Sequence, residues 1–165
     1  MAEALVKAKA RKDRREGKSP STQAGEFVHE EIRHIRSGKH GARSTKQAIA
    51  IGLSKARRAG VKLPPPAKGK TSEKTRHSAA RAYEAGQSHA SHKTSPKRSR
   101  AISGVLKHEG HSAASHAALS HQAKAAARKR SPEERSAAAR KGMRKRSPEE
   151  RSASARKAAR TRWGS

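Results

Sequence analysis

The sequence predicts a mostly α-helical chain, with a small helical hairpin followed by marginal Ala/Arg-rich helices and disordered basic linkers. Three observations predict this class. First, 41 lysines and arginines face 13 acidic residues, which gives a formal charge of +28 over 165 residues. Second, 32 apolar residues are alanine and 15 are Val, Leu, Ile or Phe, a content typical of chains that cannot fold throughout. Third, most of these bulky residues come before residue 64, at helical spacing.

The order of these features divides the chain into five segments. They are a basic N-terminal arm at 1–20, a helical hairpin at 21–63, a linker with a short helix at 64–94, an Ala/His-rich helical segment at 95–127 and basic 16-residue repeats at 128–165. In the arm, a frayed helix would place Ala4, Leu5 and Ala8 on one side. This apolar stripe is too short to pack firmly, so we expect a mobile arm.

The first helix of the hairpin is predicted by the spacing of its bulky residues. Val28, Ile32 and Ile35 stand at i, i+4 and i+7, and Phe27 lies beside them. Gly38 follows the last of them and ends the helix, because glycine tolerates the left-handed conformation of a helix C-terminus. The pattern therefore predicts one amphipathic helix with an apolar face turned toward a partner.

The second helix supplies that partner. Ser44 and Gln47 have the spacing of a capping box, in which each side chain satisfies a free backbone amide of the other residue. The helix then runs to a stop at Gly60. A short loop between the two helices predicts an antiparallel pair. Two apolar residues are expected to fold back over the open end of the hairpin: Val61 and Leu63.

Weaker helices are predicted beyond the triple proline that closes the hairpin. Ser72–Ala85 has a helical composition and would stop at Gly86. Ser95 and Pro96 then form a helix start, with serine as N-cap and proline at the first helical position. An Ala-rich stretch at 112–130 is expected to form another helix. The apolar face that follows the Ser-Pro start consists of Ile102, Val105 and Leu106.

An internal repeat ends the chain. Residues 128–141 return as residues 144–157 with one difference, at a period of 16. In each copy a serine, a proline and a glutamate form a helix start with a capping box, represented in the first copy by Ser131 and Glu134. Each unit is therefore predicted to be a short Ala/Arg helix preceded by three basic residues.

The sequence indicates a protein without enzymatic chemistry. It has no cysteine, and its single aspartate, Asp13, lies in the basic arm. His29 and His34 look like a zinc-protease motif but stand at i and i+5, about 140° apart on a helix, whereas that motif needs i and i+4. We therefore expect no catalytic residue, no metal site and no cofactor.

The charge excess predicts a polyanionic partner, because each neutralised phosphate releases bound counterions. The expected contacts are cationic residues in the hairpin loop, near the end of its second helix, after Ser95 and in the repeats. They are Lys39, His40, Arg43, Lys46, Lys55, Arg57, Arg58, Lys97, Arg98, Arg128, Lys129, Arg130, Arg144, Lys145, Arg146, Arg160 and Arg162. An ordinary solvated surface and helix caps are the alternative explanation of the hairpin residues.

Two resemblances accompany these residues. The stretch from Phe27 to Gly60, with Lys46-Gln47-Ala48-Ile49-Ala50-Ile51-Gly52-Leu53-Ser54-Lys55-Ala56-Arg57-Arg58-Ala59-Gly60, resembles a family of small basic bacterial proteins without an established activity. The resemblance implies a bacterial source and a genuine domain. The remaining chain resembles bacterial histone H1-like tails in composition, and Ser95-Pro96-Lys97-Arg98 matches a pattern that recurs in histone tails and is associated with A·T-rich minor grooves.

These observations predict a nucleoid-associated, histone-like protein of the cytoplasm that compacts or bridges duplex DNA without sequence specificity. One Phe, one Tyr and one Trp offer few platforms for stacking bases, which favours duplex DNA over RNA. An RNA- or ribosome-associated protein is one alternative, and a protein-interaction module tethered to DNA is another. A membrane partner is not expected, because no apolar anchor is present.

Overall fold

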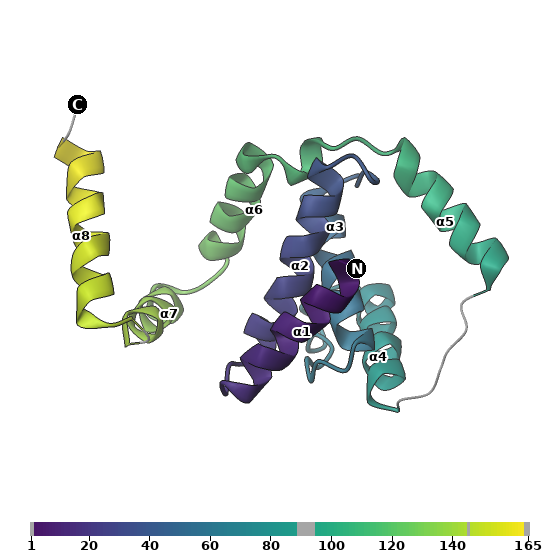
Figure 1. Cartoon of the computed structure of the whole chain (residues 1–165), viewed down its shortest axis with the longest axis horizontal. Helices are drawn as coiled ribbons and strands as arrows, with labels where there is room; N and C mark the ends of the chain where they lie inside the picture. Colours follow the sequence, from purple (N-terminus) through teal and green to yellow (C-terminus); the bar gives the residue numbers. More distant parts are fainter. Residues whose placement is uncertain (1, 89–94, 145, 164–165) are drawn as a thin grey trace. The chain divides into compact units, whose positions relative to one another are not determined.

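A computed structural model describes residues 2–88, 95–144 and 146–163 (Figure 1). The described residues form eight α-helices and one short 3-10 helix, and no strand is found among them. The chain divides into two compact units, residues 1–122 and 123–165. The elements are α1 (Ala2–Arg15), α2 (Pro20–Arg36), α3 (Thr45–Arg58), α4 (Glu73–Gln87), α5 (Pro96–His108), η1 (Ser112–Ala114), α6 (His116–Arg128), α7 (Pro132–Arg144) and α8 (Pro148–Trp163). The prediction of a mostly α-helical chain is confirmed.

The predicted hairpin forms from α2 and α3. Gly38, with φ of 74°, follows the C-terminus of α2, and Gly60, with φ of 87°, follows that of α3. Ser44 caps α3 by accepting a hydrogen bond from the Gln47 amide at 3.2 Å. The return bond differs from the prediction, because the Gln47 side chain accepts from the amide of Arg43, at 2.8 Å, instead of that of Ser44. The cap therefore also fixes the last residue of the loop.

The N-terminal helix α1 is part of the core, so the prediction of a mobile arm is wrong. The buried side is a different one from the predicted stripe: Val6 and Ala10 are buried, whereas Leu5 is 65% exposed. α1 contacts α2, and the two buried residues extend an apolar surface that α2 and α3 already present. The full cluster consists of Val6, Ala10, Ala24, Phe27, Ala56 and Val61, with Leu53, Ala59 and Leu63 packed against it.

A second cluster lies around the other end of α2. Here η1 inserts two alanines, Ala113 and Ala114, between α2 and the start of α3. Thr45 and Arg36 hold η1 by donating to the carbonyl oxygens of Ala113, at 2.7 Å, and Ala114, at 2.8 Å. The expected continuous helix from residue 112 is therefore interrupted, and α6 starts afresh after Ser115. The cluster consists of Ile32, Ile35, Ala42, Ala48, Ala113 and Ala114.

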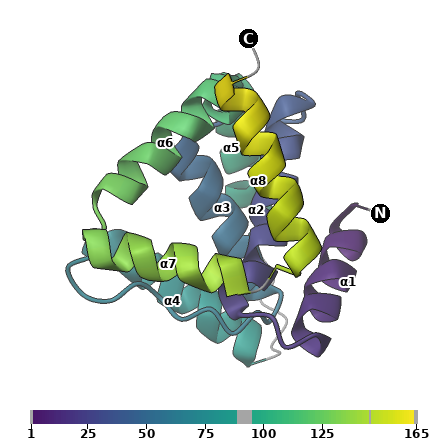
Figure 2. The same ribbon diagram turned by 90° about the vertical axis from the view of Figure 1, so that its left-hand side faces the viewer.

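Helix α4 packs on α3, which contacts both α2 and α4 (Figure 2). It buries Ala79 and Ala82. The helix runs one residue past the predicted stop at Gly86 and ends at Gln87, and Gly86 allows a close approach to α3. A Cβ placed on Gly86 would overlap the carbonyl oxygen of Arg57. The segment assigned to a linker therefore contributes a packed helix to the first unit.

Helix α5 is attached through its C-terminal end. The amides of Gly41 and Ala42 donate to the carbonyl oxygens of Leu106, at 2.7 Å, and Gly110, at 3.0 Å. The predicted apolar face is mostly exposed, with Ile102 at 54% and Val105 at 62%. None of the residues of α5 is buried. This helix consequently has little packing of its own.

The capping boxes predicted in the C-terminal repeat are present. At the start of α7, the Glu134 amide donates to Ser131 Oγ at 3.2 Å, and the Ser131 amide donates to Glu134 Oε2 at 3.0 Å. The corresponding bonds of Ser147 and Glu150 open α8. No helix in the described part of the chain is both long and apolar enough to cross a membrane.

Replacing Val6 by alanine tests whether α1 is packed. The lost methyl groups leave a cavity beside Phe27, so we expect a loss of about 1–3 kcal/mol in the free energy of unfolding. Leu5→Ala on the exposed side is the matched control and should change stability by less than about 0.5 kcal/mol. Urea titration followed by circular dichroism measures both variants, and equal effects would contradict a packed α1.

Gly52 tests how closely α2 and α3 approach. A Cβ at Gly52 would lie 2.6 Å from Val28 Cα, so Gly52→Ala must separate the helices and should cost about 1–3 kcal/mol. Gly25 lies inside α2, and a Cβ added there would meet no atom within 4 Å, so Gly25→Ala should stabilise the chain by about 0.5–1 kcal/mol through helix propensity. Thermal unfolding of the two variants should therefore shift in opposite directions.

Candidate nucleic-acid interface

The second unit concentrates cations that have no partner within it. Residues 123–165 hold fifteen lysines and arginines against four glutamates. None of the side chains described in this unit is buried, and no ion pair is found among them. In the first unit, by contrast, many carboxylates are bound to lysine, arginine or histidine. The described cations of the second unit are thus available to an external anion.

The four glutamates of the second unit serve the helix starts. Glu134 and Glu150 accept backbone hydrogen bonds in the capping boxes. The hydroxyls of Ser131 and Ser147 lower the pKa of the Glu133 and Glu149 carboxyls, and a backbone amide contributes further. Negative charge at a helix N-terminus opposes the positive end of the helix dipole. The acidic residues therefore order the helices and leave the arginines unneutralised.

The tribasic segments of the repeat lie at the helix junctions. Arg128 ends α6, and Lys129 and Arg130 lie in the turn before α7, all three exposed. In the second copy Arg144 ends α7, and Arg146 donates to Ser154 Oγ at 3.3 Å. Lys145 lies outside the described residues. Two further predicted contacts are exposed in the last turn of α8: Arg160 and Arg162.

The hairpin loop separates into an exposed and an internal part. Lys39, Arg43 and Lys46 are exposed, as a phosphate contact requires. His40 is half-buried, and its Nε2 atom lies 3.3 Å from Glu31 Oε1. Because its ring turns inward toward a carboxylate, His40 is less accessible to a phosphate than Lys39, Arg43 and Lys46.

The three cations near the end of α3 have different environments. Arg57 is buried, and its guanidinium donates to the carbonyl oxygens of Leu63, at 3.1 Å, and Pro64, at 3.2 Å. Burial lowers the pKa of the Arg57 guanidinium. Its two hydrogen bonds hold the chain after Gly60 against α3. Lys55 is bound to the buried Glu31 at 2.5 Å, and Arg58 is exposed. Arg57 is therefore a structural residue, and its assignment to a phosphate contact is corrected.

Lys97 and Arg98 lie in the first turn of α5 and are exposed. Ser95 and Pro96 occupy the predicted N-cap and first helical positions, but the Ser95 side chain makes no capping hydrogen bond. The two cations are therefore accessible at the start of a helix that has little packing to hold it in place.

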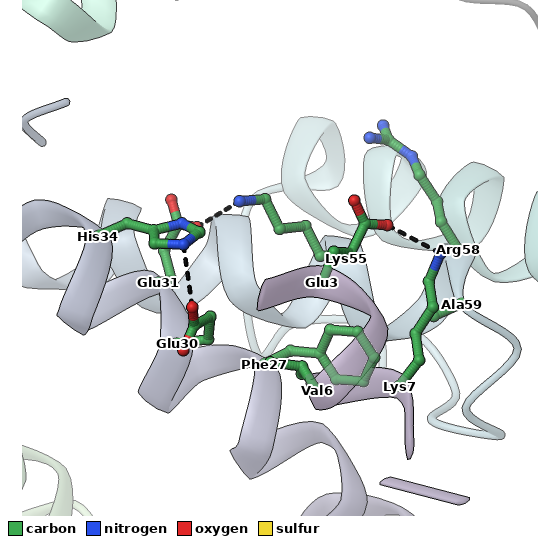
Figure 3. A pocket seen from close by; sticks show the side chains of 10 residues that line it. All are labelled: Glu3, Val6, Lys7, Phe27, Glu30, Glu31, His34, Lys55, Arg58 and Ala59. Atoms are coloured by element: carbon green, nitrogen blue, oxygen red, sulfur yellow. Dashed lines mark hydrogen bonds and ion pairs between the residues drawn. The ribbon is translucent and has the colours of Figure 1, made fainter. Parts of the chain in front are cut away.

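A hollow of about 340 Å³ lies between α1, α2 and α3 of the first unit (Figure 3). Its lining mixes carboxylates with cations, and Glu3 is bound to Lys7 at 2.8 Å. Because the lining carries both signs of charge, the hollow does not favour binding of a nucleic-acid phosphate backbone. Its residues are Glu3, Val6, Lys7, Phe27, Glu30, Glu31, His34, Lys55, Arg58 and Ala59.

One end of this hollow holds a cluster that the sequence did not predict. Ligand atoms of Glu31, His34 and His40 all lie within 4.8 Å of one another. Glu31 is 1% exposed. Burial, followed by the charge of Lys39, lowers the pKa of His34. His34 meets His40 from the loop, whereas His29, which the sequence spacing already separated from His34, is exposed.

Comparison with known proteins connects part of the chain to a family. Residues 15–68 match the model of a family of unknown function, DUF6496. The match fits the resemblance of residues 27–60 to an uncharacterised family and covers the whole α2–α3 hairpin, about a third of the chain. No match was found among curated proteins or among solved structures. The comparisons thus support the hairpin as a recurring unit and carry no activity with them.

Arg57→Ala tests the structural role of this arginine. Its loss leaves two carbonyl oxygens without their donor, so we expect a decrease of about 1.5–3 kcal/mol in the free energy of unfolding. Arg58→Ala removes the same charge from an exposed position and should change stability by less than about 0.5 kcal/mol. Urea unfolding of both variants measures the difference, and equal stability of the two variants would contradict the structural role of Arg57.

Proposed function

We propose that the chain binds duplex DNA through its phosphates, with little sequence preference, and acts as a histone-like, nucleoid-associated protein that compacts or bridges DNA. The supporting observation is the second unit, where fifteen cations meet four glutamates and no described side chain is buried or ion-paired. Charge of this density without internal compensation calls for an external polyanion.

Phosphate contact explains why the repeat has this composition. α7 and α8 have arginines and lysines around the helix and bury no residue that the structure describes, so internal packing contributes little to them. Short helices of this kind are marginal in water. Neutralisation of the arginines by phosphate removes their mutual repulsion and favours the helix. Contacts of this kind position a protein on nucleic acid but carry no sequence information.

The aromatic residues favour a duplex over single strands. Phe27 is buried in the core, and Tyr83 is half-buried on α4. Trp163 is the remaining aromatic residue of the sequence. Proteins that hold single-stranded nucleic acid usually stack successive bases on several exposed aromatic rings. A chain with so few of them is better suited to the phosphate backbone of a duplex.

Two separate basic surfaces would allow bridging. The first unit carries twenty-six lysines and arginines against nine acidic residues, with exposed cations at Lys39, Arg43 and Lys46. The repeats of the second unit supply the other surface. A protein with two such surfaces can contact two duplex segments or two turns of one segment. Compaction of DNA follows from this valency.

Binding of the full chain to duplex DNA across a salt series tests the proposal. Log K falls as log salt rises, and each lost phosphate contact makes this fall less steep by about 0.9. The variant Arg128→Gln, Lys129→Gln, Arg130→Gln should therefore reduce the steepness by about 2.7 if all three residues contact phosphate. The matched control changes three ion-paired cations of the first unit with the same loss of charge: Lys7→Gln, Lys12→Gln and Arg33→Gln.

The control should change the slope much less, because its cations already have carboxylate partners. Two duplexes of unrelated sequence and a structured RNA of equal length complete the experiment. Similar affinity for both duplexes and weaker binding of RNA support the proposal. Stronger binding of the RNA would favour the RNA- or ribosome-associated alternative, and equal slopes for both triple variants would overturn the assignment of the repeats.

A further inference from the structure

A cluster of Glu31, His34 and His40 lies in the first unit, next to the hairpin loop. Two of the three side chains come from one turn of α2, where Glu31 and His34 are three residues apart. The third comes from the loop between α2 and α3, which returns over this turn after Gly38. The rings of His34 and His40 are 6.3 Å apart and nearly perpendicular.

Two buried polar atoms of the cluster make no hydrogen bond in the described part of the chain. Among the described residues, Glu31 Oε1 and His34 Nε2 are buried without a hydrogen bond. His34 Nε2 lies at ion-pair distance, 3.0 Å, from Glu30 Oε1 (Figure 3), but this contact does not have hydrogen-bond geometry. A buried polar group that loses water without a replacement costs roughly 1–3 kcal/mol. Two such atoms side by side therefore indicate that a partner belongs between them.

The contacts of the two ring nitrogens of His40 indicate the nature of this partner. Its Nδ1 atom lies 3.0 Å from the carbonyl oxygen of Gly41, which can only accept, so Nδ1 carries the hydrogen. In the neutral ring Nε2 then presents a lone pair to Glu31 Oε1, 3.3 Å away. Two acceptors facing each other require a positive centre between them. A carbonyl bond of this kind also orients histidines that ligate metals.

A metal ion satisfies all three atoms together, whereas protonation would have to charge both histidines, His40 toward Glu31 and His34 toward Glu30, side by side in one cluster. Burial favours the uncharged form of His34, which is the form that ligates. Two imidazoles and one carboxylate are a common ligand set for zinc in sites that keep a position open. We propose that Glu31 Oε1, His34 Nε2 and His40 Nε2 bind one Zn²⁺ ion.

The surroundings set the affinity and the access. Lys55 holds the other carboxylate oxygen of Glu31, which fixes the ligand but adds a positive charge nearby. Tetrahedral ligand bonds of about 2.1 Å place ligand atoms about 3.4 Å apart, so the three atoms, which lie within 4.8 Å of one another, must move closer when the ion binds. The nearby positive charge and this movement both weaken binding. Glu30, Glu31 and His34 line the hollow of Figure 3, through which the ion and a water ligand can enter.

Titration of the full chain with Zn²⁺ alone, followed by isothermal calorimetry, tests the site. One ion should bind per chain, and the ion should raise the unfolding temperature. His34→Gln and His40→Gln should each weaken binding at least about tenfold. His29→Gln is the matched control, because His29 is on the same helix but outside the cluster, and it should leave the affinity unchanged.

The outcomes separate this site from the other histidines of the chain. Absence of saturable binding, or binding that survives both ligand variants, would overturn the proposal. Circular dichroism establishes whether the variants are folded. If His34→Gln does not fold, the result for His40→Gln, which lies in the loop, decides the test. The spectrum of bound Co²⁺ gives an independent readout, since visible bands typical of four-coordinate cobalt should appear with the native chain and disappear with His40→Gln.

Discussion

The shortage of bulky apolar side chains governs how this chain folds. With 15 Val, Leu, Ile and Phe residues, the first unit cannot build a thick core, so its helices approach through small residues. Ala24, Ala48, Ala56 and Ala114 are fully buried. Glycines at helix contacts bring backbones close together, and close backbones let short side chains exclude water. Packing of this kind tolerates little added volume.

The shortage of bulky apolar side chains also accompanies a difference between the two units in how charged residues are placed. In the first unit helices pack, and buried carboxylates such as Asp13 and Glu31 are paired with lysines that remain partly exposed. Removing one member of such a pair leaves a buried charge without compensation. In the second unit no described side chain is buried, and the glutamates are occupied with helix starts. Buried packing and a concentration of cations without a carboxylate partner therefore occur in different parts of the described chain.

Local sequence signals predicted the elements well and their contacts poorly. Spacing of apolar residues, glycine stops and capping boxes are short-range features, which is why the hairpin and the repeat helices were predicted. The burial of Val6 depends on surfaces formed by α2 and α3, and that of Arg57 on the chain folding back after Gly60. Glu31 and His40 meet through a loop whose path no spacing rule gives. The sequence alone did not predict contacts that depend on how distant helices and loops fold against one another.

The capping boxes give each repeat a self-contained start. Because Ser131 and Glu134 complete the first turn of α7 using bonds internal to the turn, the helix needs no neighbour to begin. The same applies sixteen residues later at Ser147. A duplicated or deleted copy therefore disturbs no buried contact that the structure describes. The tail can lengthen or shorten over evolutionary time, one copy at a time, and its total charge can be adjusted while the packed helices remain under separate selection.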